Sequence, residues 1–305
     1  MTVLIHAIID VGSNTVRMAI YQIEQGHIEM LMKKKHLVGL AAYIRAGAMQ
    51  QSGIDKVCEV LNEYKAFLNS FHIQQVTAFT TAALRNATNS REAVQQIVER
   101  TGIQVRVISG DEEATYDFIG ATHDLREASG LLIDIGGAST EIVSYENHQI
   151  LDKTSLPVGS LALHTKYAAD ILPTRAETER MRADVEELLA ALPDFIAGTH
   201  RNICGIGGTF KGTRAIYNQL FDMTHSNVEI NTSRLGEIIA RFCSDQELSQ
   251  EDTILLMKTV PDRMHTILPG MVIADVLAKH FNSDSITYSD SGVREGYIYH
   301  EIVRK

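Results

Sequence analysis

The sequence predicts an α/β protein made of two similar domains with mixed sheets. Two segments, AIIDVGSNTVRMAIY around Asp10 and LLIDIGGASTEIVSY around Asp134, are built alike and lie 124 positions apart. Strand-like and helix-like patterns alternate along the chain, which is typical of α/β folds. The 305 residues are 45% apolar, enough for two domains that each bury a core. Such proteins commonly bind ligands where domains meet, so an interdomain cleft is the expected site.

The composition limits the classes of function. The net charge of −10 argues against a general nucleic-acid binder, which would show a basic surface. The three cysteines lie far apart without a CxxC pair, as in a protein with reduced thiols. No apolar run approaches the roughly 20 residues of a membrane span, and the first residues enter a strand without a signal-peptide pattern. We therefore expect a cytoplasmic protein that binds neither a membrane nor a nucleic-acid polymer.

The first half opens with a predicted hairpin, residues 3–10 and 16–24, and a third strand at 27–32. A helix with Ser52 as its N-cap follows, because apolar residues recur at helical spacing beyond it. The other predicted elements of this half are, in order, a strand at 74–81, a short helix at 82–86, a helix from Ser90 to a C-cap at Gly102, a strand at 105–109 and a helix after Gly110.

A polar stretch at residues 123–130 separates the halves and sets predicted domains of 1–125 and 126–305. The second half is predicted to begin with another hairpin and to end with a helix that can pack back on the first domain. Its other predicted elements are, in order, a long helix at 178–192 closed by Pro193, a strand at 202–206 that enters a glycine turn, a helix from Lys211, helices at 253–260 and 270–281 broken at Pro261 and Pro269, a strand at 285–290 and a terminal helix at 293–305.

The turns of the two similar hairpins suit phosphate. A turn rich in Gly, Ser and Thr presents backbone N–H groups in a concave nest and adds hydroxyl donors. One such turn usually does no more than connect strands, but two aligned copies, each after an Asp at a strand end, favour a ligand site. The residues concerned are Asp10, Ser13, Asn14 and Thr15 in the first copy and Gly136, Gly137, Ala138 and Ser139 in the second.

Two acids of the second hairpin can hold a divalent cation. Asp134 ends the first strand, and Glu141 lies seven residues later on the returning strand, so strand pairing can bring it back beside the turn. Mg²⁺ takes one or two carboxylates, substrate oxygens and retained waters, and Asp10 offers a further carboxylate in the first copy. The same residues also suit ordinary roles, as turn caps for the aspartates and as a solvated strand edge for Glu141.

An acid and a cation elsewhere in the chain fit phosphoryl transfer to water. Glu112 and Glu113 precede an apolar helix, where acids are common because the helix dipole favours them. Hydrolysis of a phosphate chain needs an acid that orients water and cationic donors around the transferring group. Arg85, in TTAALRNATN, is the leading cation because small residues flank it and a guanidinium grips phosphate in two places. An arginine solvated at a helix end is the alternative.

Several other residues are weaker candidates for ligand binding, and the sequence alone does not decide their roles. The glycine turn at 205–209, with Gly207 and Gly208, fits either a nucleotide site or a tight turn into a helix. The run Lys33 to Lys35 fits a solvated strand end or a contact with a distant part of a long polyanion. The weaker cationic candidates are Arg17, Arg45, Lys211, Arg214 and Arg294.

Seven motifs in order carry a family resemblance: IDVGSNTVRM, TTAALRNATN, ISGDEEATYDFIGA, IDIGGASTEIV, GIGGT, LPGM and SDSGVREGYIY. Over residues 5–300 they resemble the exopolyphosphatase and guanosine pentaphosphate phosphohydrolase family (Ppx/GppA). The resemblance implies two ribonuclease H-like domains of the actin-like ATPase superfamily with a phosphate-binding cleft between them. It also implies removal of a terminal phosphoryl group from inorganic polyphosphate or guanosine pentaphosphate, with water and Mg²⁺ (or Mn²⁺).

The resemblance assigns roles to residues at matching motif positions. It implies that Glu113 is the catalytic glutamate that positions or deprotonates water, that Asp134 and Glu141 bind the metal, and that Arg85 grips phosphate. The two hairpin turns match the family's phosphate loops. A homodimer is plausible from the family.

Three features depart from the family pattern. Ala138 stands where many members have a third glycine, so the loop must avoid positive φ there. HLVGLAAYIRAG replaces a common RLGEGL-type stretch, and the sequence lacks the helical C-terminal domains of long members. We expect an exopolyphosphatase, with guanosine pentaphosphate hydrolysis as the alternative. A kinase or ATPase of the same superfold, and a non-catalytic sensor of guanosine tetra- or pentaphosphate, are the rivals.

Overall fold

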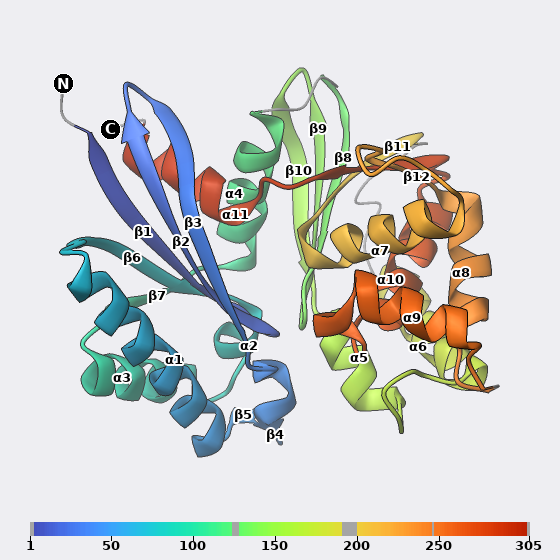
Figure 1. Ribbon diagram of the computed structural model, residues 1–305, viewed down its shortest axis with the longest axis horizontal. Helices are drawn as coiled ribbons and strands as arrows, with labels where there is room; N and C mark the ends of the chain where they lie inside the picture. The colour runs from blue at the N-terminus through green and yellow to red at the C-terminus, as the bar shows by residue number, and fades with distance from the viewer. Residues whose placement is uncertain (1–2, 124–127, 191–199, 246, 304–305) are drawn as a thin grey trace. The chain divides into compact units, whose positions relative to one another are not determined.

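The computed structural model describes residues 3–123, 128–190, 200–245 and 247–303 (Figure 1). By its internal contacts the chain divides into two units. Unit 1 comprises Met1–Glu113 and Tyr297–Lys305, and unit 2 comprises Ala114–Gly296. The division falls within helix α4 (Gly110–Thr122). The predicted domain boundary after residue 125 lies outside the described residues.

The sheet of unit 1 is mixed and has the strand order β3-β2-β1-β6-β7. Its first three strands are antiparallel, and β6 and β7 run parallel to β1. The predicted hairpin and third strand are confirmed, although the third strand continues to Leu37 and carries Lys33 to Lys35 along a sheet edge. Lysines on an edge strand hinder pairing with other chains. The strands are β1 (Leu4–Val11), β2 (Thr15–Glu24), β3 (His27–Leu37), β6 (Gln75–Thr80) and β7 (Val105–Val107).

Helices on one face of this sheet enclose a core of aliphatic side chains from both layers. The predicted stripe from Val57 to Leu68 is buried, but the helix begins at Gln51, so Ser52 lies in its first turn and is not the N-cap. Gly102 is the C-cap as predicted, with φ 70°. The remaining elements of the unit are η1 (Leu40–Tyr43), β4 (Ile44–Arg45), β5 (Ala48–Met49), α1 (Gln51–Ser70), α2 (Ala82–Arg85), α3 (Ser90–Thr101) and the π-helical turn Ile298–Val303.

The sheet of unit 2 repeats this arrangement, with the order β10-β9-β8-β11-β13 and one further strand, β12, at the edge. Its first three strands are again antiparallel, and β11 and β13 are parallel to β8. The internal repeat in the sequence therefore corresponds to a repeated sheet topology. The strands are β8 (Gly130–Ile135), β9 (Thr140–Glu146), β10 (Gln149–Leu156), β11 (Asn202–Ile206), β12 (Glu229–Asn231) and β13 (Ser285–Ser289).

Four helices of unit 2 begin three or four residues before the predicted start. Two begin at Arg175 rather than Thr178 and at Gln250 rather than Thr253. The other two begin at Gly207 rather than Lys211 and at Ile267 rather than Gly270, so that Pro269 lies in the first turn of its helix, where a missing N–H is tolerated. The predicted end near Pro193 and the last two residues of the terminal helix lie outside the described residues. The elements are α5 (Ser160–Tyr167), α6 (Arg175–Ala190), α7 (Gly207–Leu220), η2 (Thr232–Arg234), α8 (Leu235–Phe242), α9 (Gln250–Thr259), η3 (Pro261–Arg263), α10 (Ile267–His280) and α11 (Val293–Tyr297).

Within unit 2, the later turns of α4 pack closely on the start of α11. A Cβ at Gly296 would lie 2.9 Å from the backbone nitrogen of Gly120 and closer still to the carbonyl oxygen of Tyr116. Glycine therefore permits this approach of two backbones. Ala114, Phe118 and Ala121 of α4 also pack in one buried cluster with side chains of β8 and β9. Among the described residues, no helix is both long and apolar enough to cross a bilayer.

Candidate active site

The turn between β1 and β2 is tight and closed by its own backbone. Gly12 donates its N–H to the carbonyl oxygen of Thr15 at 3.1 Å, and a Cβ at Gly12 would lie 3.1 Å from the same oxygen. Asp10 is buried at the end of β1, and the side chains of Ser13 and Thr15 are buried in the turn. The predicted residues Asp10, Ser13, Asn14 and Thr15 therefore lie together within unit 1.

The turn between β8 and β9 has the same construction. Gly136 donates to the carbonyl oxygen of Ser139 at 2.9 Å, and a Cβ at Gly136 would lie 3.0 Å from that oxygen. Ala138 avoids positive φ, as its side chain requires. Among the described residues, the N–H groups of Gly137, Ala138 and Ser139 have no hydrogen-bond acceptor. Adjacent backbone donors of this kind suit an anion.

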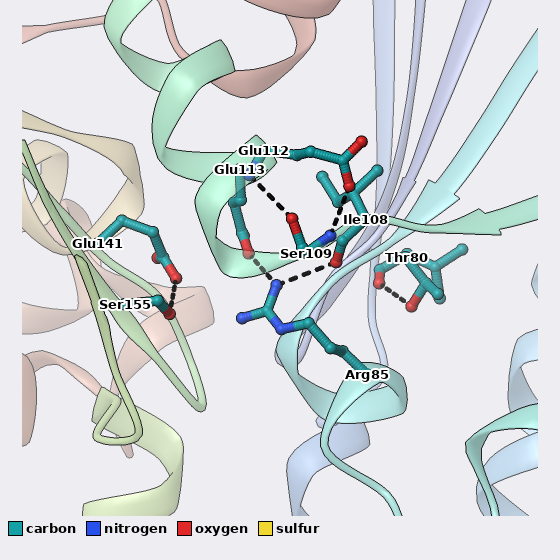
Figure 2. Close-up of polar contacts among 9 residues, drawn as sticks. Thr80, Arg85, Ile108, Ser109, Glu112, Glu113, Glu141 and Ser155 are labelled. Atoms are coloured by element: carbon teal, nitrogen blue, oxygen red, sulfur yellow. Dashed lines mark hydrogen bonds and ion pairs between the residues drawn. The ribbon is translucent and has the colours of Figure 1, made fainter. Parts of the chain in front are cut away.

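Glu113 and Arg85 form an ion pair in unit 1, with 2.6 Å between Arg85 Nη1 and Glu113 Oε2 (Figure 2). Their side chains are only 15% and 10% exposed. The same Nη1 also donates to the carbonyl oxygen of Ile108 at 3.3 Å, which ties the end of α2 to the segment before α4. The predicted acid and the predicted cation are therefore in direct contact.

The adjacent acid, Glu112, has a different role. Its carboxylate accepts the N–H of Ser109 at 2.8 Å, and the hydroxyl of Ser109 accepts the N–H of Glu112 at 3.1 Å (Figure 2). This reciprocal pair is a capping box at the start of α4. Glu112 also pairs with Arg106 at the surface. Glu112 is therefore a helix-capping residue. Glu113, the next residue in the chain, instead contacts Arg85.

Asp134 and Glu141 face each other across the β8–β9 hairpin. They are direct partners in the strand register, so their side chains lie on one face of the sheet with Cβ atoms about 4.5–5.5 Å apart. Glu141 is 1% exposed and accepts a 2.7 Å hydrogen bond from the hydroxyl of Ser155 on β10 (Figure 2). Two like charges at such positions repel unless a cation or a proton intervenes.

The corresponding positions in unit 1 carry opposite charges. Asp10 is the direct partner of Arg17 across the β1–β2 hairpin, where Asp134 is the partner of Glu141 in unit 2. Of these two pairs, only the one in unit 2 consists of two acids, and a pair of carboxylates is what a divalent cation requires. No group of three or more His, Cys, Asp and Glu residues gathers as metal ligands in the described ranges. Two carboxylates completed by water and substrate oxygens are what Mg²⁺ usually receives.

The third glycine turn adjoins Asp134 in unit 2. Gly207 has φ +81°, and a Cβ there would lie 3.2 Å from the carboxyl carbon of Asp134 and closer still to one of its oxygens. Gly208 lies under the guanidinium of Arg263, with 2.6 Å between a Cβ at that position and Nη1. Arg263 was not predicted from the sequence. Its proximity depends on the η3 segment, some fifty residues later in the chain, so no local signal could have found it.

The weaker cationic candidates have varied surroundings. Lys211 pairs with Asp290 at 3.1 Å, and the guanidinium of Arg214 stacks over Tyr288 at 4.8 Å from the ring centre. Arg45 lies in the two-residue strand β4 and is exposed. Neither of these two contacts involves the residues of the hairpin turns.

The repeated strand order and the paired glycine turns define the class of protein: the two-domain fold of the actin-like ATPase superfamily. Solved structures agree with this class. A PPX-GPPA enzyme of Aquifex aeolicus superposes with a TM-score of 0.74 at 26% identity, over 98% of this chain and 100% of that one. An exopolyphosphatase of Cytophaga hutchinsonii gives a TM-score of 0.81 at 21% identity, over 97% and 96%.

The sequence comparison gives the family. Residues 19–305 match the model of the Ppx/GppA phosphatase family, so the chain belongs to this family and is a phosphatase. A putative exopolyphosphatase of Haemophilus influenzae is 27% identical over 296 residues, which cover 96% of this chain and 90% of that protein.

Proposed function

We propose that this phosphatase hydrolyses the terminal phosphate of inorganic polyphosphate, with Glu113 as the group that orients water. The observation that carries the proposal is the difference between two adjacent acids. The carboxylate of Glu112 caps α4, whereas the carboxylate of Glu113 is largely buried against Arg85. An acid placed beside a phosphate-binding cation is what transfer to water requires. The family relative described as a putative exopolyphosphatase supports the choice of substrate.

The residues of the site supply orientation and charge. Arg85 has a planar guanidinium that can bind phosphate oxygens in two places, and its contact with Glu113 sets acid and phosphate side by side. Each unit offers its own anion-binding turn: the N–H groups of Gly137, Ala138 and Ser139 in unit 2 would bind phosphate oxygens, and the turn from Ser13 to Thr15 in unit 1 would do the same. Glu113 would hold the attacking water and accept its proton.

A divalent cation fits the acidic pair of unit 2. Mg²⁺, or Mn²⁺ in its place, would be held by Asp134 and Glu141 and would offset negative charge on the phosphate oxygens. Ser155 would keep the Glu141 carboxylate in place through its hydrogen bond. The glycine turn at 207 and 208 would add to this end of the site, because Gly207 leaves room for the carboxylate of Asp134 and Gly208 for the guanidinium of Arg263.

The decisive experiment compares Glu113→Gln with Glu112→Gln. Both variants remove one charge from neighbouring positions of one helix turn, but only the first removes the proposed base. Phosphate release from polyphosphate should fall by about 10²–10⁴-fold in Glu113→Gln and remain near the wild-type rate in Glu112→Gln, with both proteins folded. Near-normal turnover by Glu113→Gln would refute the assignment.

A substrate panel separates the proposal from its alternatives. We would measure phosphate release from polyphosphates of several lengths and from guanosine pentaphosphate, with and without Mg²⁺. Faster release from guanosine pentaphosphate would favour the nucleotide phosphohydrolase. Transfer of phosphate from ATP to an acceptor, or formation of ADP, would favour a kinase or ATPase. Tight binding of guanosine tetra- or pentaphosphate with no hydrolysis of any phosphate chain would favour a sensor.

A further inference from the structure

The first turn of α5 donates hydrogen bonds to the carbonyl groups of the 136–139 turn. Ser160 donates both its N–H and its hydroxyl to the carbonyl oxygen of Gly136, at 2.9 and 3.0 Å. Leu161 and Ala162 donate their N–H groups to the carbonyl oxygen of Gly137, at 3.0 and 2.9 Å. Two consecutive carbonyl groups of the turn are therefore held by the first turn of α5.

Because peptide bonds are planar, this contact also determines the direction of the N–H groups in the turn. In a trans peptide the C=O of one residue and the N–H of the next point in opposite directions. Because the carbonyl groups of Gly136 and Gly137 point toward α5, the N–H groups of Gly137 and Ala138 must point away from it. These are the donors that lack an acceptor among the described residues. The α5 contact thus fixes the direction in which the turn can bind an anion.

Gly159 makes the contact possible. A Cβ at this position would lie 2.7 Å from the Cα of Ala138 and closer still to its backbone nitrogen and to the carbonyl carbon of Gly137. These are backbone atoms and cannot move aside as the end of a long side chain can. Gly159 does not have positive φ, since its φ is −148°, so close packing against the turn and not backbone conformation requires glycine here.

Unit 1 has a related arrangement, in which the carbonyl groups that are held lie one position later in the aligned turn. Val38 and Gly39 donate their N–H groups to the carbonyl oxygen of Asn14 at 3.0 and 2.9 Å, and Ala41 donates to that of Ser13 at 2.9 Å. Here too the donors follow the third strand of the hairpin sheet, and two consecutive carbonyl groups are held. The individual hydrogen bonds and their order differ between the two units, so what recurs is the anchoring of the turn by backbone N–H groups.

We propose that Gly159 and Ser160 are positioning residues of the phosphatase, which hold the 136–139 turn with its N–H groups directed at the phosphate. The proposal rests on the proposed function, because it takes this turn to be a phosphate-binding loop. Neither residue would touch the substrate. They would affect substrate binding indirectly, by holding the peptide groups of Gly136 and Gly137 in place.

The test compares Gly159→Ala and Ser160→Ala with Gly236→Ala. Gly236 lies on α8 of the same unit, and a Cβ there has no atom within 4 Å, so this variant controls for the glycine-to-alanine change itself. We would measure kcat and KM for phosphate release from polyphosphate, together with the melting temperature. A displaced loop should lower kcat/KM of Gly159→Ala by about tenfold or more. Ser160→Ala should raise KM by about threefold or more and change kcat less, because it loosens the loop for substrate and transition state alike. Gly236→Ala should match the wild type.

A folded Gly159→Ala protein with wild-type kcat/KM, or a Ser160→Ala protein with wild-type KM, would overturn the proposal. If Gly159→Ala does not fold, the KM of Ser160→Ala decides. If the wild type releases no phosphate from any chain, the proposed function fails. Binding of tripolyphosphate then tests the positioning role by itself: weaker binding to Gly159→Ala than to Gly236→Ala supports it, and equal binding contradicts it.

Discussion

Arg85 and Glu113 contact each other through a 2.6 Å ion pair, although 28 positions separate them in the sequence. Adjacent parallel strands bring them together, because Arg85 ends the short helix after β6 and Glu113 lies in the first turn of the helix after β7. Ligands of α/β sheets commonly bind beyond the carboxyl ends of such strands. The pair therefore places a buried acid and a cation together at the carboxyl ends of the parallel strands, where ligands commonly bind.

Replacement of Arg85 by lysine should impair catalysis without unfolding the protein. Lysine keeps the charge but not the planar fork that can contact Glu113 and a phosphate together. We expect kcat/KM for phosphate release to fall by about 10- to 100-fold in Arg85→Lys, and further in Arg85→Ala. Steady-state kinetics, with the melting temperature as a check on folding, would measure this.

Arg106→Lys is the matched control for this change. Arg106 pairs with Glu112, the neighbouring acid, but its side chain is 48% exposed. Its replacement should leave kcat/KM within about twofold of the wild type, since exposed ion pairs contribute little. Equal losses in Arg85→Lys and Arg106→Lys would contradict a special role for the buried pair.

Removal of one acid from the pair in unit 2 should weaken the response to Mg²⁺. Asp134→Asn or Glu141→Gln would leave a single carboxylate at the proposed metal site. The Mg²⁺ concentration for half-maximal phosphate release should rise by about tenfold or more, in line with the effect of lost ligand interactions on metal affinity. A titration of activity with Mg²⁺ after treatment with EDTA would measure the shift.

Thermal unfolding gives an independent readout of the same site. A cation that binds only the folded protein raises its melting temperature. Mg²⁺ should therefore stabilise the wild type and Glu146→Gln, which removes an exposed acid from the same strand, more than Glu141→Gln. An unchanged Mg²⁺ response in both Asp134→Asn and Glu141→Gln would place the metal elsewhere.

The internal repeat allowed much of the fold to be predicted. It gave both hairpins, and the register that places Asp134 opposite Glu141 follows from hairpin pairing alone. The distinction between Glu112 and Glu113 was also accessible, because Ser109 and Glu112 have capping-box spacing. Without this capping signal, the two acids are equivalent on spacing.

Elements with weak or interrupted patterns were missed. The register of β10 shifts between Ile150 and Asp152, which breaks the alternation that identifies a strand. Helix α5 has eight residues and a weak helical period, whereas α8 carries apolar residues at helical spacing (Leu235, Ile238, Ile239 and Phe242) and was accessible from the sequence. Contacts such as that of Gly159 with the 136–139 turn depend on packing between distant segments, so local sequence could not reveal them.

Glu177 should stabilise the start of α6, and its contribution should depend on pH. Its carboxylate accepts the N–H groups of Thr174 at 2.8 Å and Ala169 at 3.2 Å, and Thr174 Oγ1 accepts the N–H of Glu177 at 3.2 Å. Burial acts to raise the pKa of this carboxyl, but these hydrogen bonds and Arg180 outweigh burial and leave the pKa below its ordinary value. A lowered pKa means that the stabilisation is present above the ordinary pKa and is lost as pH falls through the lowered one.

Glu177→Ala should therefore lower the free energy of unfolding by about 1 kcal/mol near neutral pH, the usual value of a helix cap. The difference from the wild type should shrink as the pH falls below the ordinary pKa of a glutamate, about 4.3, and through the lowered pKa of Glu177. Urea unfolding of both proteins across this pH range would measure it. Glu187→Ala, an exposed change on the same helix, should show neither the loss nor the pH dependence. If the loss of unfolding free energy in Glu177→Ala stays constant as the pH is lowered, packing and not the ionised carboxylate would account for the effect.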